Sequence, residues 1–190
     1  MDRVVRLFVA LVPPADVALG MLQAVQAGLD GGSLTLPAHR LIPPTDLHMT
    51  LAFIGDTRAK GVRDVIESVD RACTGFGPLV LRPSTLVTIP TPQDGGPPRL
   101  LAVLTDAPSA LIEIQRRLAL RLTTPKRSGR RGRFLPHVTV LRYAHGQSSG
   151  AIELPALVPD WPVREVRLLQ STLNAAGARY TPLHAAPLAT

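Results

Sequence analysis

The sequence predicts an α+β domain with two lobes around a central cleft. Strand-like and helix-like segments follow one another in the order β-α-β-α-β-β-α-β-β-β. Two segments with the same pattern, residues 46–55 and 135–142, each lie near a predicted helix, which suggests a diverged internal duplication. Because no linker-like stretch separates the halves, residues 1–190 are expected to form one bilobal domain.

The first half of the chain contains two predicted strands and two predicted helices. Residues 4–12 are nearly all apolar, as in a buried strand, and the prolines that follow end that strand. Apolar residues recur at helical spacing over 15–28 and over 57–74, where Thr57 can cap the helix. Cys73 falls on the apolar face of the second helix, so a buried and inert thiol is expected.

The second half is richer in strands. Further strands are predicted at 78–89, 99–105, 163–173 and 178–184, a helix at 107–122, and a short extended piece at 39–44 in the first half. Glycine, proline and basic residues predict loops at 90–98 and 123–132. Residues 144–162 are expected to be irregular, with Trp161 as a packing anchor.

The composition is that of an ordinary folded protein. Hydrophobic residues make up 45% of the chain, and no run approaches the roughly 18 apolar residues of a membrane span. The N-terminus lacks the long apolar centre of a signal peptide, and a single cysteine cannot form an internal disulfide. We therefore expect a cytoplasmic protein that does not associate with membranes.

The net charge of +7 is unevenly distributed. All basic residues except two are arginines, which suit bidentate phosphate contacts, although a GC-rich genome would give the same preference. Residues 114–152 contain nine basic residues and no acidic one. A patch of one sign beside a candidate site predicts a polyanionic partner.

Two segments carry the same His-apolar-Thr-apolar pattern: HMTL from His48 and, eighty-nine residues later, HVTV from His137. Side chains alternate along a strand, so His48 and Thr50 share one face, as do His137 and Thr139. Each segment therefore buries its apolar residues and presents an imidazole and a hydroxyl on the other face. We expect the two pairs to face each other across one cleft.

Two imidazoles around one phosphorus atom can act as acid and base. Because the ordinary pKa of histidine is about 6.5, one ring can be neutral while the other is protonated. One ring takes a proton from the attacking water, and the other gives a proton to the leaving alkoxide. Threonine hydroxyls can donate to phosphate oxygens, and arginines can stabilise the growing negative charge. This chemistry requires no metal or other cofactor.

Other catalytic classes fit the sequence less well. Asp46, His48 and Asp56 are close in sequence, but there is no His-Glu-x-x-His motif or cysteine cluster to predict a metal site. A Gly-x-Ser-x-Gly motif is also absent. Three histidines lack the paired pattern and are expected to be non-catalytic: His39, His145 and His184.

The motifs resemble those of the two-histidine (2H) phosphoesterase superfamily, which is defined by paired His-x-Thr/Ser-x (HxTx) motifs. The chain is most similar to its RNA 2′,3′-cyclic phosphodiesterase branch, historically named 2′-5′ RNA ligase. The resemblance covers nearly the whole chain, since segments 6–10, 47–55, 134–142 and 179–183 resemble the opening strand, the two motifs and the closing strand. The sequence departs from the family at Asp46, where the family often has Asn.

The resemblance implies two pseudo-symmetric lobes, each with an antiparallel sheet and outer helices around the cleft. It implies hydrolysis of RNA 2′,3′-cyclic phosphate ends to 2′-phosphomonoesters, with weak reverse 2′-5′ ligation. His48 would be the proton donor to the leaving 3′ oxygen and His137 the proton acceptor from water, although a pseudo-symmetric cleft also allows the reverse. Arg142 and Phe134 would contact phosphate and base, and Tyr180 of the closing segment is a further candidate substrate contact.

The basic loop 126–133 adds three candidate RNA contacts: Arg130, Arg131 and Arg133. A solvated loop without a partner is the alternative. The expected partner is RNA with a 2′,3′-cyclic phosphate end, with tRNA halves as one candidate, and a monomer is expected. Two other functions remain open, a non-catalytic RNA-end-binding protein and a cyclic phosphodiesterase of a small nucleotide.

Overall fold

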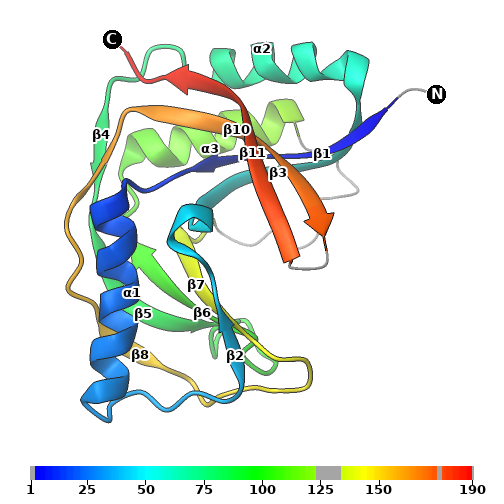
Figure 1. Cartoon of the computed structure of the whole chain (residues 1–190). Helices are drawn as coiled ribbons and strands as arrows, with labels where there is room; N and C mark the ends of the chain where they lie inside the picture. The colour runs from blue at the N-terminus through cyan, green and yellow to red at the C-terminus, as the bar shows by residue number, and fades with distance from the viewer. Residues whose placement is uncertain (1–2, 123–133, 175–176, 190) are drawn as a thin grey trace.

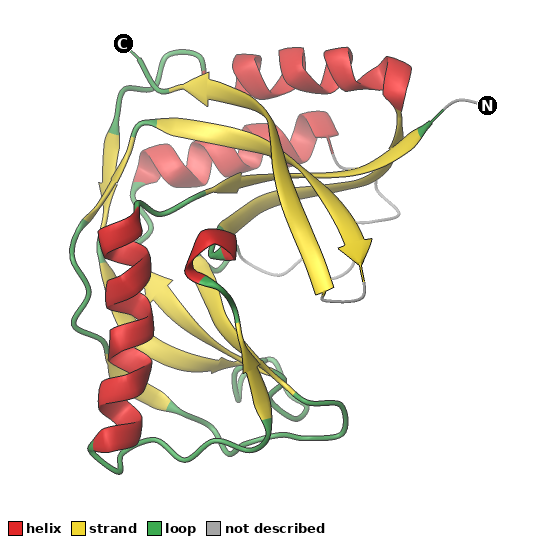
Figure 2. Ribbon diagram, in the orientation of Figure 1, coloured by secondary structure: helices red, strands yellow, loops and turns green. Residues whose placement is uncertain are grey.

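In the part of the chain that the structure describes, two large antiparallel sheets and three α-helices make up the fold, as the sequence predicts for an α+β chain (Figures 1 and 2). The computed structural model describes residues 3–122, 134–174 and 177–189. Sheet 1 has the strand order β11-β10-β1-β3, and sheet 2 has the order β2-β7-β6-β5-β8. A small, two-stranded sheet pairs β4 with β9.

Sheet 1 holds both ends of the described chain and the first motif. Its strands are β1 (Val4–Leu11), β3 (Met49–Arg58), β10 (Glu165–Asn174) and β11 (Gly177–Pro187).

Sheet 2 holds the second motif. Its strands are β2 (His39–Leu41), β5 (Pro83–Ile89), β6 (Leu100–Thr105), β7 (His137–Tyr143) and β8 (Glu153–Pro155). The small sheet consists of β4 (Leu79–Leu81) and β9 (Trp161–Val163).

The helices cover one face of each large sheet. Helices α2 (Val62–Cys73) and α3 (Ser109–Leu122) pack together behind sheet 1, where α2 contacts β10 and β11 and α3 contacts β3. Helix α1 (Ala15–Asp30) runs beside sheet 2, and its residues line a hollow together with residues of β5 and β8 (Figure 1). The opposite faces of the two sheets are left for the motif histidines, and we call each of these the site face.

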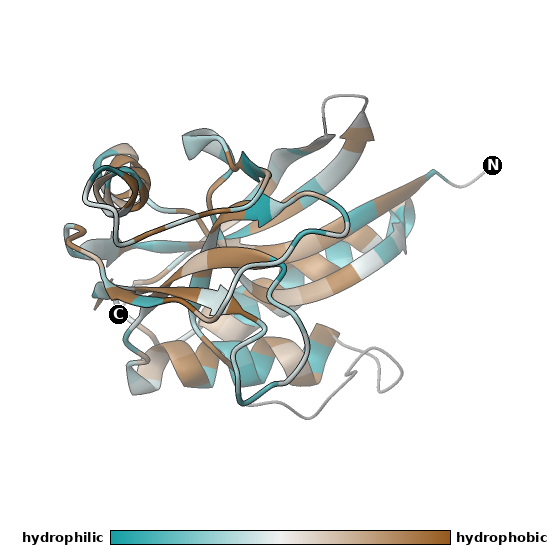
Figure 3. Cartoon of the chain, turned by 90° about the horizontal axis from the view of Figure 1, so that it is seen from below, coloured by the Kyte–Doolittle hydropathy of each residue, from teal (hydrophilic) through white to brown (hydrophobic). Residues whose placement is uncertain are grey.

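The main hydrophobic core lies on the helix side of both sheets. Alternate residues of β1, Val5, Leu7, Val9 and Leu11, are buried in this core. Figure 3 shows hydrophobic residues concentrated in the central strands. A second, smaller cluster of Phe8, Ala10 and Leu169 lies on the site face of sheet 1. The period-two pattern of β1 therefore separates core residues from site residues.

The structure corrects four predicted elements. The strand expected at 78–89 is divided into β4 and β5, because the backbone N–H of Arg82 donates to Asp106 Oδ1 (2.7 Å) instead of continuing a strand. The region 144–162, expected to be irregular, contains β8 and the start of β9. Thr57 belongs to β3 and does not cap α2, which begins five residues later at Val62. Helix α1 continues to Asp30, two residues beyond the predicted end.

Two packing predictions are confirmed. Trp161 is 1% exposed and lies in β9. Cys73 is buried on the core side of α2, where burial raises the pKa of its thiol to about 12. A thiol with this pKa stays protonated near neutral pH, as expected for an inert side chain.

No helix in the described part of the chain is long and apolar enough to cross a membrane.

Candidate active site

The strands that carry the two motifs belong to different sheets but lie against each other. Residues of β3 and β7 approach to within 8 Å, measured between Cα atoms. The segment before the first motif holds them together, because β2 pairs with β7 and the backbone N–H of Ile42 donates to Val140 O (2.9 Å). His48 follows Ile42 by only six residues. The chain therefore places the first histidine directly beside the strand of the second.

Both motif histidines are held by the same kind of hydrogen bond. Nδ1 of His48 lies 2.7 Å from the carbonyl oxygen of Asp46, and Nδ1 of His137 lies 2.8 Å from that of Leu135. Since a carbonyl oxygen can only accept, each Nδ1 carries the proton and donates. In the neutral ring, Nε2 is then left with its lone pair, as a general base requires.

The two imidazoles share one electrostatic environment. The pKa of His48 is lowered from 6.5, first by burial and also by the charges of Arg142 and His137, while the backbone bond to Asp46 and the Asp46 carboxylate oppose this shift. Burial and Arg142 likewise lower the pKa of His137 from 6.5, against its backbone bond to Leu135. The charge of Arg142 thus acts on both rings, and that of His137 acts on His48, so the three side chains are near enough to influence one another.

A β-bulge places Arg142 on the same face as the second motif. Strict alternation would point residue 142 away from residues 137 and 139. In the pairing of β6 with β7, however, Ala102 is opposite Thr139 and Leu101 is opposite Leu141, so Val140 is an extra residue. Val140 and Leu141 are both fully buried, and Arg142 turns outward to the site face.

The first motif has the same bulge at the same position. Ala10 is opposite Thr50 and Val9 is opposite Ala52, so Leu51 is the extra residue. Leu51 and Ala52 are both buried, and the next residue is exposed. Each motif threonine is also paired with a fully buried alanine, Ala10 in sheet 1 and Ala102 in sheet 2. Both motifs therefore have the same bulge after the threonine and the same buried alanine opposite it, in addition to the histidine.

Arg40, which the sequence did not indicate as a site residue, is also brought to the site. It is the cross-strand partner of Arg142 in the pairing of β2 with β7, so the two side chains share a face. Both charges act on the hydroxyl of Tyr180, whose pKa is raised by burial and lowered by Arg142 and Arg40. Only the register of β2 against β7 reveals this position, and the local sequence carries no signal of that register.

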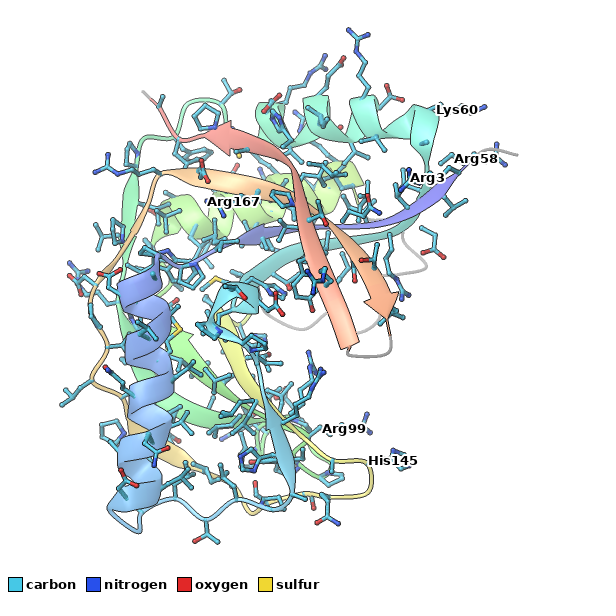
Figure 4. The ribbon with its side chains drawn as sticks, in the orientation of Figure 1. Arg3, Arg58, Lys60, Arg99, His145 and Arg167 are labelled. Atoms are coloured by element: carbon cyan, nitrogen blue, oxygen red, sulfur yellow. The ribbon has the colours of Figure 1, made fainter. Side chains whose placement is uncertain are left out.

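Aromatic rings surround His48. The centroid of its ring lies 5.0 Å from that of Phe8 and 4.9 Å from that of Tyr180, in an edge-on arrangement with Tyr180. A small hollow of about 70 Å³ beside it is lined by Asp46, His48, Arg167 and Tyr180, among others. Arg167, labelled in Figure 4, is ion-paired there with Glu165 at 2.6 Å.

Four other residues were predicted to contact the substrate. Phe134 is partly buried and packs against the main core. Arg130, Arg131 and Arg133 of the basic loop lie outside the described residues, so their expected contacts with RNA stay predictions.

Residues 114–152 contain no acidic residue, but two of their arginines are paired with an acidic residue just before that stretch. Arg116 and Arg117 are paired with Glu113 at 2.7 and 3.0 Å, and Arg117 also donates to Thr74 O and covers the ring of Phe76. The pairing lowers the pKa of Glu113 to about 2. The count of charges along the sequence therefore overstates the positive charge near α3.

The three histidines outside the motifs occupy other surroundings. His184 Nε2 lies 2.6 Å from Asp70 Oδ1 and links β11 to α2 on the helix side of sheet 1. His39 is exposed, and its Nδ1 contacts Pro37 O at 2.8 Å. His145 is exposed on the loop after β7, close to Arg99 (Figure 4). Within residues 3–122, 134–174 and 177–189, no three His, Cys, Asp or Glu side chains are grouped as a metal site would require.

Known proteins share this fold and part of the sequence. Residues 12–98, which include the first motif, match the family described as LigT like phosphoesterase. The crystal structure of TT0787 of Thermus thermophilus has a TM-score of 0.77 and 23% identity, covering 97% of this chain and 98% of that one. E. coli LigT complexed with 3′-AMP has a TM-score of 0.76 and 24% identity, covering 99% and 100%. No curated protein matches the sequence.

Residues 12–98 are therefore similar to the LigT-like phosphoesterase family, and the described fold is that of TT0787 and E. coli LigT. The predicted resemblance to the 2H phosphoesterase superfamily is confirmed to this extent, and it is consistent with phosphoesterase activity.

Proposed function

We propose that the protein hydrolyses RNA 2′,3′-cyclic phosphate ends to 2′-phosphomonoesters by metal-independent acid–base catalysis. The single observation that best supports this proposal is the arrangement of His48 and His137. Each donates its Nδ1 proton to a backbone carbonyl, which leaves Nε2 for catalysis, and the charge of Arg142 acts on both rings. One phosphate bound near Arg142 would then lie within the influence of both imidazoles.

The proposed reaction transfers one proton at each imidazole. Nε2 of neutral His137 takes a proton from water as the water oxygen attacks phosphorus. The bond from phosphorus to the 3′ oxygen breaks, and protonated His48 gives its Nε2 proton to that oxygen. The products are a free 3′ hydroxyl and a 2′-phosphomonoester, and exchange of protons with solvent restores the two rings. Thr50, Thr139 and Arg142 stabilise the negative charge that develops on the phosphate oxygens.

The surroundings of the two rings support His48 as the acid. Among the described residues, Asp46 supplies the one carboxylate that raises the pKa of either ring, and it acts on His48. A carboxylate nearby favours the protonated imidazole. Burial and Arg142 lower the pKa of both rings, and the negative charge of a bound phosphate would favour protonation of His48.

A pair of cations supports a substrate that carries phosphate. Arg142 and Arg40 are cross-strand partners, so their charges share one face of sheet 2. Arg99, which Figure 4 shows beside His145, lies opposite Tyr143 at the end of β7 and is not part of this pair. A phosphate next to the cyclic end would meet the charges of Arg40 and Arg142.

The test is product analysis with a short RNA that carries a 2′,3′-cyclic phosphate, in the presence of excess EDTA. The proposal expects a 2′-phosphomonoester at an undiminished rate. Full inhibition by EDTA would contradict the metal-independent mechanism, whereas binding without any product would identify a non-catalytic RNA-end-binding protein. Equal turnover of a cyclic mononucleotide and the RNA, at low and high salt alike, would favour a small nucleotide as substrate.

A further inference from the structure

In both bulges that follow the motif threonines, the carbonyl oxygen of the extra residue accepts a hydrogen bond from another segment of the chain. The extra residue of the second motif is Val140, and the backbone N–H of Ile42 donates to its oxygen (2.9 Å). The extra residue of the first motif is Leu51, and the side-chain amide of Gln115 donates to its oxygen (3.3 Å). Gln115 therefore holds the first bulge as Ile42 holds the second.

Gln115 interrupts the apolar face of α3. Leu111 lies four residues before it and Leu118 three residues after it, and both of these leucines are fully buried. Residues at this spacing share one face of a helix, so the pattern predicts an apolar side chain at position 115. The amide found there is half-buried and reaches β3, which α3 contacts. A hydrogen-bond partner is what makes a polar group favourable at such a position.

The bond from Gln115 is made where the first motif strand has the least other support. β3 is the last strand of sheet 1, next to β1. A bulge interrupts the ladder of hydrogen bonds between two strands, and here the interruption comes directly after Thr50. The contact of Gln115 with Leu51 attaches the strand to α3 at this point. It therefore fixes the backbone next to the motif threonine.

The direction of the motif hydroxyls depends on this backbone. Within residues 3–122, 134–174 and 177–189, the hydroxyls of Thr50 and Thr139 make no hydrogen bond, and both residues are half-buried. The β-branched side chain of threonine has few choices of χ1 once its backbone is fixed. A donor to a phosphate oxygen is most effective when its direction is set before the reaction. Control of the backbone beside each threonine is thus control of its hydroxyl.

We propose that Gln115 is a positioning residue, which holds the bulge at Leu51 and thereby aims the hydroxyl of Thr50 at the phosphate of the substrate. The inference rests on the proposed function and adds a residue that acts without touching the substrate. Helix α3 packs behind sheet 1, on the face opposite to the motif side chains, so the effect of Gln115 reaches the site only through β3.

The test removes the amide and preserves the volume of the side chain. Gln115→Met has nearly the shape of the wild-type residue and cannot donate a hydrogen bond. Gln115→Leu, which completes the apolar face of α3, is a second variant with the same loss. Gln23→Met is the matched control, because Gln23 is an exposed glutamine on α1. Thermal unfolding checks that each variant is folded, and the substrate is a short RNA with a 2′,3′-cyclic phosphate end.

Gln115→Met and Gln115→Leu should lower the same kinetic parameter as Thr50→Val, which is expected to be kcat. The loss should be roughly 3- to 100-fold, as for a small misplacement of a reacting group, and should not exceed that of Thr50→Val. Gln23→Met should resemble the wild type. An unchanged rate in both Gln115 variants would overturn the proposal.

Coupling between substitutions distinguishes positioning from a general effect on the fold. Because Gln115 acts through Thr50, Gln115→Met should cost little further rate when Thr50→Val is already present. In a Thr139→Val background, it should cost its full factor. Equal factors in the two backgrounds would overturn the proposal, because a general loss of structure affects both motifs alike.

A measurement without turnover separates this inference from the proposed function. If the wild-type protein turned over no RNA with a cyclic end, the proposed function would fail, and NMR of threonine methyl groups would still test the positioning. Gln115→Met should lower the order parameter of the Thr50 methyl group and leave that of Thr139 unchanged. An unchanged order parameter at Thr50, or equal changes at both threonines, would overturn the role of Gln115 independently of turnover.

Discussion

Arg40 and Arg142 are direct cross-strand partners in the pairing of β2 with β7, and both belong to the face that carries His137. Like charges placed opposite each other in an antiparallel pair are destabilising, and an anion bound between them would offset that repulsion. We therefore propose that the phosphate of the substrate binds at this pair. The two arginines have the same chemistry, but Arg142 lies on the strand of His137 and Arg40 lies on the neighbouring strand.

Arg40→Ala should weaken RNA binding more than it slows chemistry. Arg40 is one strand further from the histidines than Arg142, so its loss is expected to raise KM and leave kcat nearly unchanged. The slope of log K against log salt should fall by about 1, as for the loss of one phosphate contact. Titrations at several salt concentrations measure this slope. Arg63→Ala, on the solvent side of α2, is the control, and an unchanged slope in Arg40→Ala would remove Arg40 from the RNA path.

His48→Ala and His137→Ala should each lower kcat by about 10²- to 10⁴-fold, because each removes one proton transfer. The double variant should lose far less than the product of the two single effects, since the rings act as a unit. His39→Ala is a matched control, because His39 has the same Nδ1 contact with a carbonyl oxygen two residues earlier and lacks the motif. Thermal unfolding should show that all variants stay folded. Near wild-type turnover by either motif variant would exclude that histidine from the mechanism.

Thr50→Val and Thr139→Val preserve shape and remove one hydroxyl each. They are expected to lower kcat by roughly 10- to 1000-fold, as for the loss of one oxyanion donor. Because their partners Ala10 and Ala102 are fully buried beneath the site, the two substitutions should have similar structural effects. Single-turnover kinetics measure the chemical step directly. A change in KM alone, with kcat preserved, would assign the hydroxyls to ground-state binding instead.

The pH dependence follows from the lowered pKa values of both imidazoles. Burial and Arg142 lower them from 6.5, so the kcat/KM profile, which reports the free enzyme, should be bell-shaped with its maximum below pH 6.5. Activity falls at low pH as the base becomes protonated and at high pH as the acid loses its proton. The bound phosphate favours imidazolium, so the basic limb of kcat should lie at higher pH than that of kcat/KM.

Asp46→Asn identifies which limb belongs to His48. The carboxylate of Asp46 raises the pKa of His48, so its removal should move the limb set by His48 to lower pH and leave the other limb in place. The Nδ1 contact should persist, because it uses the backbone oxygen of residue 46. Profiles of the variant and the wild type, measured at one salt concentration, decide the assignment. If both limbs stay in place, the carboxylate does not set the proton affinity of His48.

The sequence was sufficient to predict which side chains of a regular strand are buried, because side chains alternate between the two faces. Leu47, Met49 and Leu51 are buried, as expected, and the predicted resemblance agrees with the LigT-like family match over residues 12–98. The facing of Arg142 and Phe53 was beyond this reasoning, because a bulge depends on how a strand pairs with its neighbour. Arg40 was missed for the same reason, since its importance comes from its register against β7.

Short elements were also hard to predict. β8 and β9 have three residues each and contain proline, so neither shows a strand-like pattern of its own. The break at Arg82 depends on a hydrogen bond to Asp106, a residue 24 positions away. Thr57 has the chemistry of a helix cap, but pairing with Val5 keeps it in β3. In each case a tertiary contact overrides the local preference.

The hydrogen bond from Ile42 to Val140 has a mechanical consequence. This pairing attaches the segment that leads into the first histidine to the strand that carries the second. Any change in the spacing of His48 and His137 that preserves the pairing must therefore be taken up by the few residues between Ile42 and His48.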